Sequence, residues 1–150
     1  VVGGTASGHL YRFRGRQLCQ VAEAAGGQQP VYALFHDPVS GLLLSGSRDG
    51  RVCFWDKALR PSRDPMRVDE PAFGSAAPAV RSVCRNDRHV LVGTRGGEVF
   101  ELDTAASTAC RVVSSHCTGE LWGLAVHPHR QEYYTAGDDR TLRAWAARTR

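Results

Sequence analysis

The sequence predicts an all-β fold made of repeated antiparallel sheets, and two observations support this. First, four segments align without gaps. Each opens with Gly or Ala, passes through a polar turn holding Gly or Asp, and ends in a strand that closes on an aromatic residue or Leu. The segments are GTASGHLYRF (4–13), GSRDGRVCFW (46–55), GTRGGEVFEL (93–102) and AGDDRTLRAW (136–145). Second, apolar runs ending in turn signals precede the last three segments, and no stretch has helical periodicity.

Each segment has the composition of a β-hairpin. In Ser47-Arg48-Asp49-Gly50, the Asp side chain can hydrogen-bond to nearby backbone and the Gly can adopt the positive φ that a tight turn requires. The strand that follows, Val52-Cys53-Phe54-Trp55, is apolar at every position. We therefore expect a sheet buried on both faces between two neighbouring sheets.

The spacing of the segments identifies the repeat. Their final residues are separated by 42, 47 and 43 positions, close to the ~40–45 residues of a four-stranded WD repeat. The sequence therefore predicts a WD-repeat β-propeller segment of about three and a half four-stranded blades. The surplus of the middle interval falls at 57–75, which we expect to be an extended loop. Because propellers usually close with about 4–8 blades, we expect part of a larger ring.

The predicted organisation is the end of a partial blade at 1–16, a WD repeat at 17–56, a degenerate repeat at 57–103 and a WD repeat at 104–150. First strands of the sheets are expected at 31–38, 80–87 and 121–128. Second strands are expected at 42–45, 90–93 and 133–136, and outer strands at 17–23, 66–69 and 109–114.

Composition excludes several functional classes. The net charge of +4 comes from scattered Arg residues, which is typical of a solvated surface. No apolar run approaches the ~20 residues of a membrane helix. The N-terminal Val1-Val2-Gly3-Gly4 lacks the basic and apolar regions of a signal peptide, so we expect none here. Aromatic residues lie in predicted strand cores, which argues against nucleic-acid binding. The absence of an initiator Met suggests an excised or incomplete piece. We expect no membrane, nucleic-acid or small-molecule partner.

The cysteine pattern indicates neither a disulfide framework nor a metal site. The five cysteines are odd in number and none has C-x-x-C spacing. We expect reduced, mostly structural thiols in a cytosolic protein, with Cys53 and Cys84 inside apolar runs. Cys117 lies near His116 and His127, but we interpret this proximity as chance. No metal or cofactor is expected.

The last repeat has polar residues at the positions where WD repeats hold a buried hydrogen-bonded network, and the second segment retains two of them. The network residues are His116, Thr135, Asp139 and Trp145, with Asp49 and Trp55 in the earlier repeat. These residue types also build catalytic triads. The structural interpretation is favoured because the same slots recur with other residues. Gly26 and Ser75 stand at the His slot, and Gly96 stands at the Asp slot.

Two longer stretches of the sequence, each containing one of the repeated segments, also resemble a particular protein family. HCTGELWGLAVHPHRQEYYTAGDDRTLRAW (116–145) resembles a blade of the echinoderm microtubule-associated protein-like family, and VRSVCRNDRHVLVGTRGGEVFEL (80–102) resembles the degenerate repeat that precedes it. The segments at 1–13 and 45–56 resemble the two repeats before those. Departures are Ala25-Gly26-Gly27 where the family has Gly-Ala-His, and Trp145-Ala146 where it has Trp-Asp.

The resemblance implies a non-catalytic scaffold that associates with tubulin or microtubules, in the cytoplasm and on the cytoskeleton. Alternatives are a signalling or ciliary adaptor without tubulin contact, and an enzyme. We expect partners to bind at the loop-bearing ends of the sheets. Candidate residues there are Tyr32, Arg48, Arg81, Arg95, Glu120, Trp122 and Asp138. Trp122 could equally belong to the core.

Overall fold

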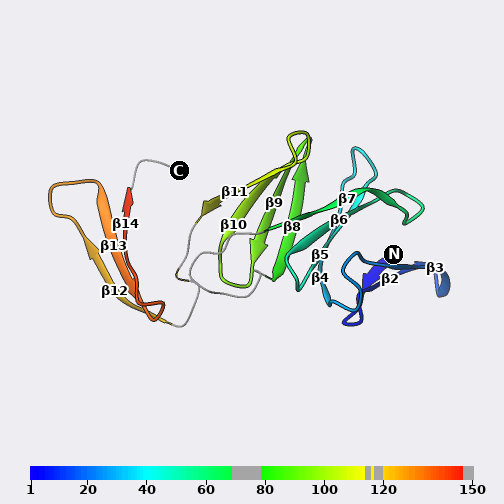
Figure 1. Cartoon of the computed structure of the whole chain (residues 1–150), viewed down its shortest axis with the longest axis horizontal. Coiled ribbons are helices and arrows are strands. Elements are labelled where there is room, and N and C mark those ends of the chain that lie inside the picture. The colour runs from blue at the N-terminus through cyan, green and yellow to red at the C-terminus, as the bar shows by residue number, and fades with distance from the viewer. Residues whose placement is uncertain (69–78, 114–115, 117–119, 147–150) are drawn as a thin grey trace. The chain divides into compact units, whose positions relative to one another are not determined.

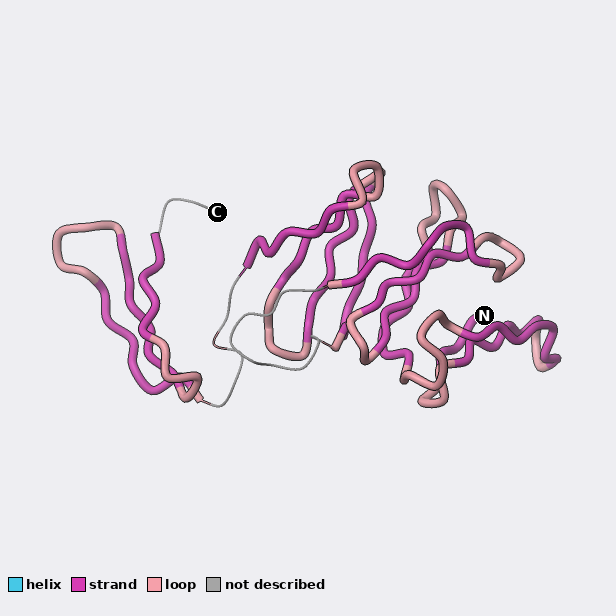
Figure 2. The backbone as a smooth tube through the Cα atoms, in the orientation of Figure 1, coloured by secondary structure: helices cyan, strands magenta, loops and turns pink. Residues whose placement is uncertain are grey.

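The computed structural model describes residues 1–68, 79–113, 116 and 120–146, and every regular element in them is a β-strand (Figure 2). The chain forms two compact units, Val1–Val113 and Ser114–Arg150, which we describe separately. The described residues contain no helix with the length and apolarity needed to cross a bilayer.

The first unit contains three antiparallel sheets in which strands that are consecutive in sequence lie side by side (Figure 1). The first sheet is β1 (Val2–Gly4), β2 (His9–Arg14) and β3 (Gln17–Glu23). The second is β4 (Val31–His36), β5 (Leu43–Ser47), β6 (Arg51–Trp55) and β7 (Pro61–Arg67). The third is β8 (Val80–Asn86), β9 (His89–Thr94), β10 (Val99–Asp103) and β11 (Thr108–Val113).

The second unit is one antiparallel sheet of β12 (Leu121–Val126), β13 (Glu132–Gly137) and β14 (Leu142–Ala146). Four sheets of three or four strands in meander order confirm the predicted all-β, propeller-type architecture. The hairpin turns lie where the sequence placed them. Gly50, for example, has a φ of 83° in the turn between β5 and β6.

One expectation about the strands was wrong. The stretch at 57–75 was expected to be a loop, with an outer strand only at 66–69, but β7 occupies Pro61–Arg67. Two prolines hid this strand. Pro61 is its first residue, and Pro65 lies where the register with β6 shifts between Val52 and Phe54. Because β7 is the edge strand of its sheet, the missing N–H groups can be tolerated.

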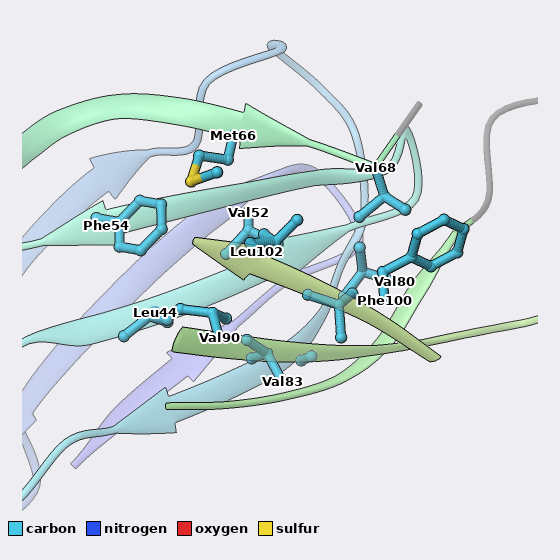
Figure 3. Packing of buried hydrophobic residues seen from close by; sticks show 12 residues of the cluster. Leu44, Val52, Phe54, Met66, Val68, Val80, Val83, Val90, Phe100 and Leu102 are labelled. Carbon is cyan, nitrogen blue, oxygen red and sulfur yellow. The ribbon is translucent and has the colours of Figure 1, made fainter. Parts of the chain in front are cut away.

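The second sheet is buried on both faces, as its continuous apolar pattern predicted. Val52 and Phe54 on β6 belong to a core cluster shared with the third sheet (Figure 3). Cys53 and Trp55, the alternate residues, belong to a cluster shared with the first sheet. Phe54 and Trp55 are each only 2% exposed. The period of two along a strand therefore sends successive side chains into two different cores.

Two of the Gly residues that open the repeated segments, Gly4 and Gly46, lie directly against the first strand of the next sheet. A Cβ added to Gly46 on β5 would lie 2.2 Å from Cγ1 and 2.9 Å from Cβ of Val80, the first residue of β8. A Cβ added to Gly4 would likewise lie 2.7 Å from Cγ1 of Val31, the first residue of β4. A missing side chain in one sheet therefore makes room for the first strand of the next.

Replacing Gly46 with Ala should lower the free energy of unfolding by about 1–3 kcal/mol, the usual range for overpacking a core. The added methyl group would collide with the buried Val80 side chain. Urea unfolding measures the change. Gly3→Ala is the matched control, because a Cβ there meets nothing within 4 Å. Equal stability of the two variants would contradict the prediction.

Candidate functional site

A continuous hydrogen-bond chain joins four side chains of the second unit. The Trp145 indole N–H donates to the Thr135 hydroxyl at 2.7 Å, and Oγ1 of Thr135 lies 2.6 Å from Nε2 of His116. Nδ1 of His116 lies 2.9 Å from a carboxylate oxygen of Asp139. Strands β13 and β14 position Thr135 and Trp145. The structure thus brings together the four residues that the sequence singled out in this repeat.

The donors and acceptors of this chain fix its polarity. The indole can only donate and an ionised carboxylate can only accept. A neutral imidazole therefore donates from Nδ1 to Asp139 and accepts at Nε2 from the Thr135 hydroxyl, whose oxygen accepts from Trp145. Thr135 is 6% exposed, and the His116 side chain is 9% exposed. Each polar group in this chain is therefore satisfied, as burial requires.

Asp139 anchors the network. Burial acts to raise the pKa of this carboxyl group, but hydrogen bonds from His116 and from the hydroxyl and N–H of Thr141 outweigh it and hold the pKa well below the ordinary value of 3.8. Arg143 adds an ion pair at 2.9 Å. Asp139 is therefore an ionised acceptor for the imidazole, and the bond to the N–H of Thr141 fixes the turn before β14.

The second sheet has only fragments of this network. The Trp55 indole donates to the Ser45 hydroxyl at 2.9 Å, while Asp49 separately accepts from Ser47 and Arg51. The structure therefore does not join Asp49 to Trp55. Gly26 stands at the His slot, and a Cβ built there would lie 2.3 Å from Nη1 of Arg51. The guanidinium of Arg51 thus binds Asp49, whereas in the second unit the His116 imidazole binds the equivalent carboxylate of Asp139.

In the first and third sheets, both the indole donor and the hydroxyl acceptor are missing. In the third sheet Val92 and Leu102 occupy the Ser45 and Trp55 slots, and both are fully buried. In the first sheet Gly3 and Phe13 occupy them. Losing both partners costs little, whereas losing one leaves a buried polar group unpaired. The degenerate repeat is therefore compatible with a well-packed sheet.

The geometry of the network differs from that of a nucleophilic site. The Thr135 hydroxyl is nearly inaccessible and already engaged by an indole and an imidazole. Three surface hollows are lined by residues of the first unit, and none of these linings includes a network residue. Within the described part of the chain, no group of three or more His, Cys, Asp or Glu side chains is placed to hold a metal ion.

The cysteines are less buried than the sequence suggested. Cys53 is buried and burial raises the pKa of its thiol, which fits a structural role. Cys19, Cys84 and Cys110 are exposed free thiols. The expectation that the thiols are mostly structural was therefore wrong, and Cys84 shows why. Its neighbour Val83 is buried, and successive residues of a strand face opposite sides of the sheet. Cys117 lies outside the described residues.

The loop-bearing end of the second and third sheets is where β4 and β8 begin and where the β5–β6 and β9–β10 turns lie. Arg81 stacks on the Tyr32 ring, with Cζ 4.2 Å from the ring centroid. The N–H of Arg48 donates to Pro30, and the N–H of Arg95 donates in the same way to Ala79. The four candidate residues of the first unit therefore lie at one end of two adjacent sheets.

The three candidate residues of the second unit also contact one another. Asp138 accepts hydrogen bonds from the backbone N–H of Glu120, at 2.8 Å, and from the Trp122 indole. These two bonds lower the pKa of the Asp138 carboxyl group. Trp122 is 72% exposed within its unit. The role of Trp122 in partner binding stays a prediction.

The sequence missed the polar clamps between neighbouring sheets. Gln20 on β3 donates to the Ala58 carbonyl in the turn after β6, and Arg63 on β7 donates to the Thr104 carbonyl in the turn after β10. Both clamps run from an outer strand to the next sheet's turn. Every residue has a backbone carbonyl, so the sequence does not mark the acceptors of these bonds. The only clue was a polar residue at a similar position in two outer strands.

Comparison with known proteins agrees with this geometry. The family model "WD domain, G-beta repeat" matches residues 19–56 and 107–146, which is more than half of the chain. The chain therefore belongs to the WD-repeat family. The stretch between the two matches contains β8, β9 and most of the third sheet, where Val92 and Leu102 replace the polar pair.

Similar proteins include relatives from the family that the sequence resembles. Echinoderm microtubule-associated protein-like 2 of Mus musculus is 31% identical over 99% of this chain, and echinoderm microtubule-associated protein-like 3 of Homo sapiens is 30% identical over 83%. The ciliary WD repeat-containing protein ctxp80 of Euplotoides octocarinatus is 27% identical over 98%. The chain spans only 22%, 13% and 19% of these relatives' lengths, respectively. The resemblance to echinoderm microtubule-associated protein-like proteins is confirmed.

Replacing Ser45 with Ala should lower the free energy of unfolding by about 1–3 kcal/mol, because it leaves the buried Trp55 indole N–H without an acceptor. The double variant Ser45→Ala/Trp55→Phe should cost less than the sum of the single variants, since both polar groups are then gone. A double-mutant cycle by urea unfolding measures this coupling. Strict additivity would contradict the role assigned to the pair.

Replacing Asp139 with Asn should destabilise the second unit at neutral pH, and the deficit should shrink in acid. The folded-state pKa of Asp139 is depressed. The carboxylate therefore contributes stability above its ordinary pKa of 3.8, and the contribution is lost as the pH falls below that value. Urea unfolding at pH 7 and pH ~3 compares the variant with the parent. A deficit of the same size at both pH values would argue against the network. Asp64→Asn, on exposed β7, removes an equal charge as a control.

Proposed function

We propose that this chain is part of a non-catalytic WD-repeat scaffold that binds tubulin, microtubules or associated cytoskeletal proteins through the loop-bearing ends of its sheets. The observation that carries the proposal is the similarity to echinoderm microtubule-associated protein-like proteins over nearly the whole chain. The corresponding location is the cytoskeleton within the cytoplasm. The parent protein's activity and partners are proposals of the same kind, because the chain spans a small share of its relatives.

The structure offers suitable contact groups for such a scaffold. Tyr32 and Trp122 each present an aromatic ring at the start of a strand, and Trp122 is held by Asp138. Aromatic and Arg side chains are the usual anchors of protein interfaces because they contribute large contact areas with few rotatable bonds. Holding the indole by a hydrogen bond lowers the entropy lost on binding. We therefore assign partner contact to these rings and to the Arg side chains beside Tyr32.

A second candidate function is a ciliary or signalling adaptor without tubulin contact. It is favoured by the similarity to the ciliary WD repeat-containing protein ctxp80. Both functions use the same surfaces and differ only in the partner, so binding data distinguish them. An enzymatic role is not favoured, because the His116, Thr135 and Asp139 side chains satisfy one another in the interior of their sheet.

The full-length protein should pellet with microtubules at physiological salt, and Trp122→Ala should weaken pelleting by about fivefold or more, as expected for loss of an aromatic anchor. Because Trp122 is largely exposed, the variant should fold normally. Val39→Ala is the control, since Val39 is 95% exposed in the turn after β4, at the opposite end of its sheet. The assay is co-sedimentation with quantified bound fractions.

The adaptor function would be supported instead if the protein neither pelleted with microtubules nor captured tubulin dimers. Normal pelleting by Trp122→Ala would remove Trp122 from the contact surface without affecting the scaffold proposal. Detectable turnover that is abolished by His116→Ala with folding intact would overturn the non-catalytic assignment.

A further inference from the structure

Three arginines at the loop-bearing end of the second and third sheets have no acidic partner in the part of the chain that the structure describes. Arg48, Arg81 and Arg95 are exposed, and their guanidinium groups make no hydrogen bond or ion pair with any described residue. Arg81 has one contact, the stack on Tyr32. Among the described residues, two carboxylates at this end are already engaged, since Asp49 pairs with Arg51 and Glu98 pairs with Arg111.

The opposite end of the same sheets is different. There Arg60 pairs with Asp56 at 3.0 Å and Arg88 pairs with Asp103 at 3.6 Å. Arg85 lies 3.9 Å from Asp37. Three arginines at that end are thus paired with turn aspartates, whereas Arg63 donates to Thr104 and Ser107. At the loop-bearing end, by contrast, three exposed arginines have no carboxylate partner among the described residues.

The backbone places the three arginines and Tyr32 in succession along this end of the two sheets. Arg48 is bonded through its backbone to Pro30, two residues before Tyr32. Arg81 of the third sheet stacks on the Tyr32 ring of the second sheet, so this contact joins the two sheets. Arg95 is bonded through its backbone to Ala79, two residues before Arg81. We call Arg48, Tyr32, Arg81 and Arg95 the arginine row.

The stack prepares Arg81 for a carboxylate. An aromatic face contacts the flat face of the guanidinium and leaves its N–H groups, which lie in the plane, free. Those groups form the fork that binds a carboxylate with two parallel hydrogen bonds. Fixing the side chain beforehand lowers the entropy lost on binding. Arg48 and Arg95, one on each side, can bind further acidic groups of the same ligand.

We propose that the arginine row binds an extended acidic segment of a protein partner, with several Glu or Asp residues in succession. In an extended chain, alternate side chains lie on one side, about 7 Å apart, which suits a row of separate arginines. A nucleic acid fits less well, because Arg81 already covers one face of the row's single aromatic ring, on which a base would stack. The proposal rests on the proposed function, in that it takes this end to be where a protein partner docks.

The test uses the full chain and a fluorescent twelve-residue Glu-rich peptide, with a Gln-for-Glu peptide of equal length as its neutral counterpart. Fluorescence anisotropy should show binding of the acidic peptide that weakens as salt rises, and no comparable binding of the neutral peptide. The triple variant R48Q/R81Q/R95Q should bind at least about tenfold more weakly, a loss equivalent to one good charge-assisted contact or more.

The matched control is R14Q/R60Q/R88Q, which removes the same net charge from exposed arginines at the opposite end of the sheets. Retained affinity in this control, with circular dichroism showing that both triples fold, would support the proposal. Equal losses in the two triples would indicate non-specific attraction and overturn it. Equal binding of the neutral peptide, tighter binding of a single-stranded oligonucleotide, or no peptide binding would also overturn it.

A separate variant tests the stack. Tyr32→Leu keeps an apolar side chain but removes the aromatic face under Arg81, so it should weaken binding of the acidic peptide by several-fold without altering net charge. Unchanged affinity would remove Tyr32 from the row. Microtubule pelleting by the same variants separates this inference from the proposed function. Pelleting without peptide binding would support the proposed function and overturn the proposal for the arginine row. Peptide binding without pelleting would support the arginine-row proposal and count against microtubule binding.

Discussion

The first unit depends on the close stacking of its sheets face to face. Successive residues of β6 enter different cores, with Val52 and Phe54 facing the third sheet and Trp55 facing the first. Such stacking requires strands to approach closely, and Gly4 and Gly46 provide the space. The apolar side chains supply the driving force, and the glycines decide how near the sheets can come. The strand register depends on this arrangement, because a slip of one residue would move every side chain to the opposite face of the sheet.

A second constraint is that a buried hydrogen-bond donor and its acceptor must be kept together or lost together. The indole donor and hydroxyl acceptor occur together at Trp55 and Ser45 and again at Trp145 and Thr135. In the third sheet both are replaced by buried aliphatic residues. The repeat can therefore lose its recognisable signature without losing its packing, because no buried group is left alone. This explains how one chain can combine well-formed and degenerate repeats.

The arrangement of charge follows from the same architecture. At one end of the sheets, turn aspartates accept hydrogen bonds from backbone N–H groups and also pair with nearby arginines, as Asp56 does with Arg60. At the other end, Asp49 pairs in the same way with Arg51, whereas Arg48, Arg81 and Arg95 face solvent. These three arginines therefore have no turn aspartate as a partner among the described residues.

The sequence by itself determined the repeat, the strand type and most of the polar network. Residues at fixed spacing, such as Asp49-Gly50 and Trp55, act locally through turn chemistry and strand periodicity, so their consequences can be read along the chain. The sequence did not predict the full extent of β7, because Pro61 and Pro65 break the local strand pattern. These prolines are tolerated because β7 lies at the edge of its sheet. The tertiary structure alone decided which cysteines are exposed, that Arg51 replaces the imidazole, and that Arg81 lies on Tyr32. These outcomes depend on which sheet lies beside which, and that contact joins residues far apart in the sequence.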